Sequence, residues 1–280
     1  MTGSVPDSTR GILRATTALR RFRMHRLAPS SELAPYAEYH WILRWDLRGQ
    51  PPHSQQVLTH PSVHMTFTTG GRARVVGIVR GVFTETISGH GRVVGVRFLP
   101  GGFRPFLDGP VSALTGRYVP VEEIFGPQAR VVADKVIAAP EEAEAIALME
   151  DLLLARVPER PDPAVAEVAA IVGRIAADPT ISRVDRLAAD LGVGTRSLQR
   201  RFAEYVGVGP KWVIGRYRMQ EAAERAAAGD GVDWAALAAE LGYADQAHFV
   251  RDFTATVGTP PARYARDCAT GAPGEAGRRG

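Results

Sequence analysis

The most constraining feature of the sequence is a repeat in its C-terminal third. Residues 187–192 read LAADLG, and residues 237–242, fifty positions later, read LAAELG. After one inserted residue the correspondence continues at a spacing of fifty-one. The matched pairs are Leu198 and Phe249, Arg200 and Arg251, Phe202 and Phe253, Val206 and Val257, Gly207 and Gly258, and Pro210 and Pro261. Such internal similarity indicates a duplicated structural unit.

Each copy of the repeat predicts two short helices joined by a tight turn. In the first copy, Leu187 and Leu191 give one helix an apolar face, and Gly192 suits the left-handed position that follows a helix. Leu198 and Phe202, four residues apart, give the next helix a buried face and leave the opposite face exposed. One such unit would fit many helical bundles, but two matched units predict a pair of helix-turn-helix motifs.

A long helix is expected between the two units. Pro210 suits a first helical position, and the helical pattern continues to about residue 228, a length of roughly 28 Å at 1.5 Å per residue. Neighbouring major grooves on one side of B-DNA lie about 34 Å apart. One subunit could therefore place two recognition helices in adjacent grooves if the DNA bends, at a cost of about 1 to 6 kcal/mol.

The C-terminal residues resemble the DNA-binding signature of the AraC family over residues 165–266. The matching positions are Gly192, Leu198, Arg200, Phe202, Gly207, Pro210, Arg218, Ala222, Gly242, Phe249, Phe253, Gly258, Pro261 and Tyr264. The resemblance implies a seven-helix, all-α domain that controls transcription, most often as an activator near a promoter, with double-stranded DNA and RNA polymerase as partners.

Base recognition is expected from the exposed face of each second helix. Arg196, Gln199 and Arg200 share one face opposite Leu198 and Phe202. Arginine can donate two hydrogen bonds to guanine and glutamine can pair with adenine, each good pair giving about 1 to 3 kcal/mol of discrimination. By resemblance these positions match base-reading positions of the family. The corresponding surface of the second unit is Gln246, Ala247 and Arg251, which predicts looser recognition.

Contacts with DNA phosphates are expected from a further set of residues. They are Thr195, Arg201, Lys211, Arg218 and His248. Residues 196–218 include six basic residues, Arg216 among them, and one acidic residue, Glu204. Positive charge is therefore concentrated on this segment. For Arg218 a salt bridge with Glu221 is the alternative. Gly194 stands where the second copy has the capping residue Asp245, so Thr195 is a candidate for either the cap or a phosphate contact.

The rest of the chain predicts an α+β protein with a β-rich, barrel-like N-terminal domain. Strands are expected at residues 39–45, 63–68, 74–79, 82–87 and 93–98. Amphipathic helices follow between residues 121 and 156 and are suited either to dimerisation or to packing on the barrel. We expect a sensor or dimerisation domain at residues 1–156, a proline-rich linker at 157–163, the DNA-binding domain at 164–266 and a disordered tail at 267–280.

The N-terminal region resembles the sensor region of an actinobacterial AraC-like subgroup. The resemblance rests on residues 95–103, which read GVRFLPGGF, and on Val119 and Pro120. It implies a β-rich domain that binds an effector or helps to form a homodimer. Seven aromatic residues could line an apolar effector pocket, although a core position is the more economical interpretation for most of them: Trp41, Trp45, Phe67, Phe83, Phe98, Phe103 and Phe106.

Catalysis and metal binding find little support in the sequence. His53, His60, His64 and His90 could suggest a metal site, but His60 and His64 on a strand would lie roughly 13 Å apart, too far for one ion. No nucleophile, base and orienting group can be assembled, so we expect no enzyme, no catalytic residue and no cofactor. A small-molecule-binding or metal-dependent barrel that carries a DNA-targeting module is the alternative function.

Composition and the chain ends suit a cytoplasmic protein. Cys268 is the one cysteine of the 280 residues, which excludes a disulfide framework and a cysteine-based zinc finger. We expect Cys268 to lie in a mobile tail and to play no covalent sensing role. The sequence has no apolar stretch of about 20 residues, as a membrane helix requires. The arginine-rich segment 10–26 is expected to be a solvated leader or a first strand, with a nucleic-acid arm as the alternative.

Overall fold

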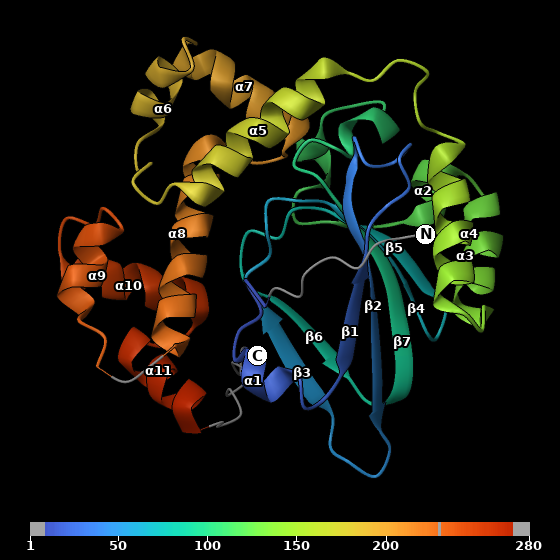
Figure 1. Ribbon diagram of the computed structural model, residues 1–280, viewed down its shortest axis with the longest axis horizontal. Coiled ribbons are helices and arrows are strands. Elements are labelled where there is room, and N and C mark those ends of the chain that lie inside the picture. The colour runs from blue at the N-terminus through green and yellow to red at the C-terminus, as the bar shows by residue number, and fades with distance from the viewer. Residues whose placement is uncertain (1–8, 229–230, 271–280) are drawn as a thin grey trace.

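A computed structural model describes residues 9–228 and 231–270 of the chain. An N-terminal β-rich domain is followed by a C-terminal domain of helices, so the expected α+β class is confirmed (Figure 1). Within the described residues no helix is both long and apolar enough to span a membrane.

The N-terminal domain contains one large antiparallel sheet and one two-stranded antiparallel sheet. The large sheet has the strand order β1-β2-β7-β4-β5-β8, and β3 pairs with β6 in the small sheet. The strands are β1 Arg23–Leu27, β2 Ala37–Leu47, β3 His53–Val57, β4 His64–Thr68, β5 Arg72–Val76, β6 Phe83–Ile87, β7 Gly89–Phe98 and β8 Tyr118–Pro120. The sheet does not close on itself, because β1 and β8 remain as its edges, and the fold is therefore barrel-like only in a loose sense.

Side chains of the large sheet alternate between two different environments. On one face Ile42, Phe67 and Val94 are buried in the hydrophobic core. On the other face their neighbours Trp41, Leu43, Thr66, Thr68 and Val93 line a cavity. This alternation follows from the two-residue period of a strand and explains why both faces of the sheet are rich in apolar residues.

The predicted helices after the sheet pack on its core face. They are α2 Val121–Phe125, α3 Gln128–Ala138 and α4 Glu142–Leu154. Figure 1 shows them on the side of the sheet that faces away from the C-terminal helices. His40 of β2 is fully buried and its Nε2 lies 2.6 Å from Glu150 Oε1 of α4. Of the two uses expected for these helices, packing on the sheet is the one that the structure shows.

The C-terminal domain has seven helices among the described residues. They are α5 Pro163–Ala177, α6 Val184–Asp190, α7 Thr195–Tyr205, α8 Pro210–Ala227, α9 Trp234–Glu240, α10 Gln246–Val257 and α11 Pro261–Thr270. Two expected boundaries need correction. Pro163 belongs to α5 rather than to the linker, because Asp162 caps the helix through Ala164 N at 2.9 Å and proline fits the first turn.

The expected tail at residues 267–280 begins too early. Helix α11 continues to Thr270, and Arg14 of the N-terminal segment contacts it: the guanidinium lies 5.3 Å from the centre of the Tyr264 ring and 3.7 Å from Asp267. Cys268 is therefore half-buried in a helix and not part of a mobile segment. Burial raises the pKa of its thiol, which lowers the population of the reactive thiolate. Residues 271–280 lie outside the described residues.

The two helix-turn-helix units are anchored differently. Buried residues of α5, α6, α7 and the first half of α8 share one hydrophobic cluster with the sheet and with α2–α4. Arg104 and Glu204 form an ion pair at 2.6 Å across this boundary, and Thr115 Oγ1 donates a hydrogen bond to Gly207 O at 2.7 Å. Buried residues of α9, α10 and α11 form a second cluster with the end of α8, which Leu13 and Leu58 join.

Arg216 does not belong to the DNA-facing basic segment in which the sequence placed it. It is 4% exposed and its Nη2 donates to the carbonyl oxygens of Arg80 at 2.5 Å and Gly81 at 2.9 Å, in the loop between β5 and β6. Its guanidinium also lies 4.7 Å from the centre of the Trp212 ring. Burial lowers its pKa to about 10, so it stays charged at neutral pH. Arg216 therefore joins helix α8 to the N-terminal domain.

Replacing Arg216 should destabilise the protein more than removing an exposed arginine of the same helix. Arg216→Ala leaves buried carbonyl oxygens without their charged donor, and we expect a loss of about 1.5 to 3 kcal/mol in the free energy of unfolding. Arg225 is the matched control, because its ion pairs with Glu221 and Glu240 are solvent-exposed, and Arg225→Ala should cost at most about 1 kcal/mol. Urea denaturation measures both, and equal losses would contradict this role of Arg216.

Candidate DNA-binding interface

The turn of each helix-turn-helix unit is closed by the same pair of backbone hydrogen bonds. Gly192 has φ 65° and Gly242 has φ 72°, the left-handed conformation that favours glycine. Gly192 N donates to Ala189 O and Val193 N to Ala188 O, both at 3.0 Å. The second unit repeats these bonds at 2.9 Å, from Gly242 N to Ala239 O and from Tyr243 N to Ala238 O. The repeat in the sequence is therefore a repeat of backbone geometry.

The second helix of each unit buries one face and exposes the other. Leu198 and Phe202 of α7 are 2% and 0% exposed, and Phe249 and Phe253 of α10 are both fully buried. The expected base-reading residues all lie on the exposed faces: Arg196, Gln199, Arg200, Gln246, Ala247 and Arg251. The structure thus leaves these side chains exposed to solvent.

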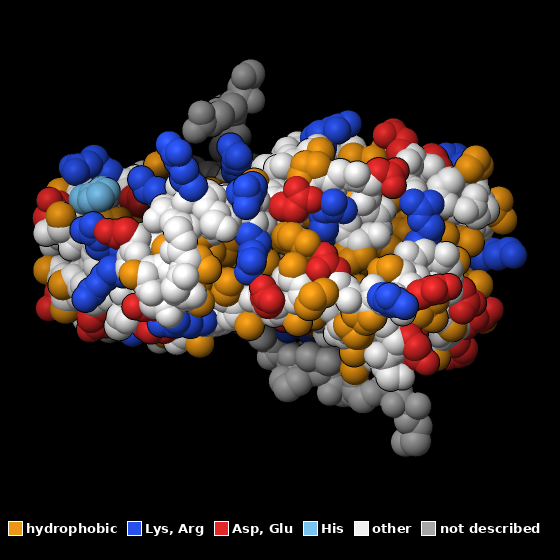
Figure 2. Space-filling model, turned by 90° about the horizontal axis from the view of Figure 1, so that it is seen from above, with side chains coloured by type: hydrophobic (Ala, Val, Ile, Leu, Met, Phe, Trp, Pro, Cys, Tyr) orange, Lys and Arg blue, Asp and Glu red, His pale blue; other side chains and the backbone are white. Residues whose placement is uncertain are grey.

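Charge is distributed unevenly over the face that Figure 2 shows. Lys and Arg side chains gather over the C-terminal helices, many of them in a row along one edge, and acidic side chains gather at the opposite end of the molecule. Such a positive stripe is the electrostatic pattern expected where the phosphates of a duplex would run.

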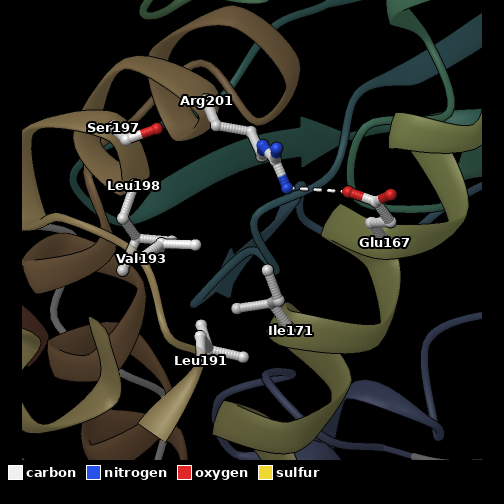
Figure 3. A pocket seen from close by; sticks show the side chains of 7 residues that line it. All are labelled: Glu167, Ile171, Leu191, Val193, Ser197, Leu198 and Arg201. Atoms are coloured by element: carbon white, nitrogen blue, oxygen red, sulfur yellow. Dashed lines mark hydrogen bonds and ion pairs between the residues drawn. The ribbon is translucent and has the colours of Figure 1, made fainter. Parts of the chain in front are cut away.

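Arg201, an expected phosphate contact, is engaged within the protein. Its Nη1 lies 2.7 Å from Glu167 Oε2 of α5, and the pair bridges a cavity of about 300 Å³ between α5 and the first unit (Figure 3). Both side chains are partly exposed, at 39% and 56%. The sequence did not indicate Glu167, because the two residues are 34 positions apart. Arg201 can reach a phosphate only by leaving or sharing this carboxylate.

Arg218 contacts an aromatic ring that the sequence did not indicate. Its guanidinium lies 4.1 Å from the centre of the Tyr243 ring, in the turn of the second unit. The alternative salt bridge with Glu221 is not formed, since Glu221 contacts Arg10 and Arg225. Arg218 on α8 thus contacts the second unit through a cation–π interaction.

The remaining expected phosphate contacts lie at or near helix starts on the surface. Thr195 and Lys211 are exposed near the N-termini of α7 and α8. Gly194 caps α7 without a side-chain hydrogen bond, and Thr195 occupies the first helical position rather than the cap. His248 is exposed in the first turn of α10, where Asp245 Oδ1 accepts from its backbone N at 2.7 Å. Helix N-termini attract anions, which suits these positions to phosphate oxygens.

A second candidate site lies in the N-terminal domain. A cavity of about 410 Å³, here called the sheet cavity, is lined by the outer face of the large sheet, by the two-stranded sheet β3–β6 and by Arg10 and Ile12. Of the seven aromatic residues that the sequence suggested for a pocket, Trp41, Trp45 and Phe83 line this cavity. The other four aromatic candidates are core residues with exposures of at most 2%: Phe67, Phe98, Phe103 and Phe106.

The histidines of the N-terminal domain do not form a metal site. Among the described residues no three His, Cys, Asp or Glu side chains are grouped so that they could hold an ion. His60 and His64 both line the sheet cavity. Burial, and next the positive charge of Arg97, lower the pKa of both rings, to about 3 for His64, so both are neutral at physiological pH. This geometry gives no support to the metal-dependent alternative.

The segment between the sheet cavity and the second helix-turn-helix unit is residues 9–14, here called the strap. Leu58 N donates to Gly11 O at 2.8 Å and Leu13 N to Gln56 O at 3.0 Å, so the strap pairs with the end of β3. Gly11 has φ 86°, and a Cβ there would lie 2.5 Å from Leu58 O. Ile12 lines the cavity and Leu13 enters the core of the second unit.

Ion pairs join the same strap to the C-terminal helices. Arg10 contacts Glu221 at 3.4 Å and Glu224 at 3.6 Å on α8. Arg14 contacts Asp267 and Tyr264 of α11. The expected arginine-rich leader is therefore a bridge between the two domains, and β1 at Arg23–Leu27 is the first strand that the sequence also suggested.

Comparison with known proteins identifies two parts of the chain. Residues 187–267 match a family described as a helix-turn-helix domain, and residues 25–120 match a domain of unknown function (DUF6597). No curated protein sequence matches the chain.

Several solved structures resemble the chain at low identity. The C-terminal domain of AraT, a response regulator from Geobacillus stearothermophilus, is 24% identical, with a TM-score of 0.31 over 34% of this chain and 84% of that one. ToxT from Vibrio cholerae is 11% identical, with a TM-score of 0.39 over 88% and 98% of the two chains. A structure of ToxT bound to an unsaturated fatty acid is 12% identical, with a TM-score of 0.37 over 91% and 94%.

The helix-turn-helix match covers both copies of the repeat, from the first helix of the first unit to α11. The matched region contains the two identical turns and the exposed basic faces described above. The duplicated geometry and the family match together show a helix-turn-helix domain over residues 187–267, and the chain is a DNA-binding transcription regulator whose signature residues resemble those of the AraC family.

Proposed function

We propose that this regulator recognises a specific DNA site with both helix-turn-helix units and that a small-molecule effector in the N-terminal domain modulates the binding. The observation that carries the first part is the pair of exposed faces on α7 and α10, each backed by two buried apolar residues. Selection of bound fragments from genomic DNA tests it, because a two-part motif with its halves about one helical turn apart is expected.

The first unit supplies the stronger base recognition in this proposal. Arg196, Gln199 and Arg200 offer donors suited to guanine and adenine edges in the major groove. Their helix is fixed in the core shared with the N-terminal domain. In the second unit Gln246, Ala247 and Arg251 offer fewer donors, so recognition of the second half-site is looser and relies more on DNA bending.

Phosphate contacts position the two units in the proposed complex. Lys211, Thr195 and His248 are exposed at or near helix starts. Arg201 and Arg218 contribute less to phosphate binding than the sequence alone predicts. Arg201 forms an ion pair with Glu167, and the guanidinium of Arg218 lies on the Tyr243 ring. Contacts of this kind add affinity without identifying bases.

Effector control is supported by the connection between the sheet cavity and the DNA-binding helices. Ile12 and Arg10 line the cavity, and Leu13 and Arg14 of the same strap contact the second unit. ToxT has been crystallised with an unsaturated fatty acid. A ligand that shifts the strap would change the position of the second unit relative to the first. This differential contact is what coupling between two sites requires.

The remaining partners and the location are further parts of the proposal. We propose that the protein acts in the cytoplasm, contacts RNA polymerase at its promoters and is not an enzyme. A homodimer is also proposed, and Val131, 57% exposed on the outer face of α3, is the side chain to substitute when that state is tested by sedimentation.

Arg200→Ala should weaken the binding of the cognate site and relax the preference at one base. Loss of a bidentate contact with guanine costs about 1 to 3 kcal/mol. Arg130→Ala, which removes an exposed arginine of α3, is the control and should leave the affinity unchanged. Fluorescence anisotropy on the selected site and on random DNA measures both. Equal losses on the two DNAs would show that Arg200 does not read a base.

Lys211→Ala should weaken the binding of every sequence alike. A phosphate contact releases about one counterion, so the slope of log K against log salt should fall by about 1 in magnitude. The chain has one other lysine, Lys135 at the end of α3. Lys135→Ala is the matched control, because it changes the net charge by the same amount. A change in base preference, or an unchanged slope, would exclude Lys211 as a phosphate contact.

Arg14→Ala should loosen the second unit selectively. The variant loses a cation–π contact and a partly buried ion pair, together about 1 to 2 kcal/mol. Amide hydrogen exchange in α11 should accelerate about 5- to 30-fold while α6 and α7 stay unchanged. Arg23→Ala, an exposed arginine of β1, serves as the control. Uniform acceleration over the whole chain would argue against a local role for the strap.

A further inference from the structure

The sheet cavity has a flat aromatic floor. Trp41, Leu43 and Trp45 alternate along β2 and share the face that lines the cavity. Trp41 is paired in register with Gly95 of β7, and Trp45 with Gly91. The two indole rings therefore lie against backbone that carries no side chain.

The two glycines are required for this arrangement of the rings. A Cβ on Gly95 would lie 2.6 Å from the Trp41 ring, and a Cβ on Gly91 would lie 2.6 Å from the Trp45 ring. Any other residue at these positions would lift the rings into the cavity. The sheet thus offers the flat faces of two indoles to whatever occupies the space above them, and flat aromatic molecules pack best on such faces.

One end of the floor is positively charged. On β7 the residues that share the cavity face are Gly91, Val93, Gly95 and Arg97. Arg97 is 8% exposed, lies 3.0 Å from Glu38 and donates to the Tyr39 hydroxyl at 3.1 Å. Arg97 lies next to the Trp41 ring, because that ring covers Gly95, and Gly95 and Arg97 are successive residues on the same face of β7.

The cavity as a whole carries more positive than negative groups. Of the described residues that line it, five are arginines, and Glu85 is the one with a carboxylate. Arg72 and Arg74 share that carboxylate at 3.1 Å and 2.8 Å. The same positive charge contributes to the lowered pKa of His60 and His64, where Arg97 is the main electrostatic cause after burial. Arg97 and Arg10 are also paired with carboxylates outside the cavity lining, Glu38 for the first and Glu221 and Glu224 for the second, so an anion in the cavity would share these arginines with them.

One polar atom of the floor lacks a partner. Trp41 Nε1 is buried and, within the part of the chain that the structure describes, makes no hydrogen bond, whereas Trp45 Nε1 donates to Ser88 O at 2.9 Å. A buried donor without an acceptor costs about 1 to 3 kcal/mol. Only an acceptor in the plane of the Trp41 ring, and not one above its face, could satisfy it.

We propose that the sheet cavity binds a planar aromatic or conjugated molecule with a single carboxylate, its flat face against Trp41 and Trp45 and its carboxylate toward Arg97. The proposal rests on the effector site proposed above and names the chemistry of its ligand. A neutral planar molecule would gain nothing from the positive charge of Arg97, and a non-planar anion would contact only part of each indole face.

Calorimetric titration of the full-length protein with three probes of similar size tests this ligand class. The probes are cinnamate, which is planar and anionic, cinnamamide, which is planar and neutral, and 3-cyclohexylpropionate, which is anionic and not planar. We expect cinnamate to bind at least about tenfold more tightly than either of the others. Absence of cinnamate binding, or equal affinity for cinnamate and either analogue, would overturn the proposal.

Two variants assign each preference to its residue. Trp41→Leu should abolish the preference for cinnamate over 3-cyclohexylpropionate, and Arg97→Gln should abolish the preference for cinnamate over cinnamamide. Arg44→Gln, on the opposite face of β2 beside Glu142, should change neither. Because Arg97→Gln leaves Glu38 without its partner, the double variant Glu38→Gln with Arg97→Gln repeats the measurement without an unpaired carboxylate.

DNA affinity measured on the same samples separates this proposal from the one on which it rests. Cinnamate binding that leaves the DNA affinity unchanged would support the ligand class and overturn effector control. Unchanged DNA binding by a protein that binds none of the probes would overturn the ligand class and leave the regulator intact. A change in DNA affinity that appears with cinnamate and is absent in Trp41→Leu would support both.

Discussion

The contact between helix α8 and the N-terminal domain is the constraint on which the rest of the structure depends. Arg216 and Gln220, both buried, donate hydrogen bonds from α8 to backbone carbonyls of the N-terminal domain, at residues 79–81 and at Leu58. Because α8 also packs against α7 and α10, its position determines where both recognition helices stand. The helix that the sequence predicts between the two units is thus also held by the N-terminal domain.

The two helix-turn-helix units differ in how firmly they are attached to the N-terminal domain. The first unit shares its hydrophobic core with the sheet, so moving it would expose buried apolar surface at about 25 cal/mol per Å². The second unit meets the N-terminal domain mainly through Leu13, Leu58 and the ion pairs of the strap. Partly exposed ion pairs are weaker than a shared core. The second unit is therefore held less firmly on the N-terminal domain than the first.

Sequence periodicity predicted the fold wherever local geometry decides it. The repeat predicted both turns, because only glycine adopts φ near 70° without strain at Gly192 and Gly242. It could not separate Arg216 from Arg218, since both are arginines on one helix and only the packing of the N-terminal domain shows which one is buried. Glu167, Tyr243 and the strap were missed for the same reason, because their partners lie far away in the sequence.

The two faces of the large sheet differ in their surroundings and therefore in the residues that they require. The face under α3 and α4 supplies the hydrophobic core and needs bulky residues such as Phe67 and Val94. The opposite face needs residues that leave space, and Gly91 and Gly95 provide it where a β-branched residue would suit the strand better. Strand β7 has no side chains to pack at Gly91 and Gly95, which are paired with Trp45 and Trp41 of β2. Its sequence therefore favours a cavity on this face over the greatest stability of the strand.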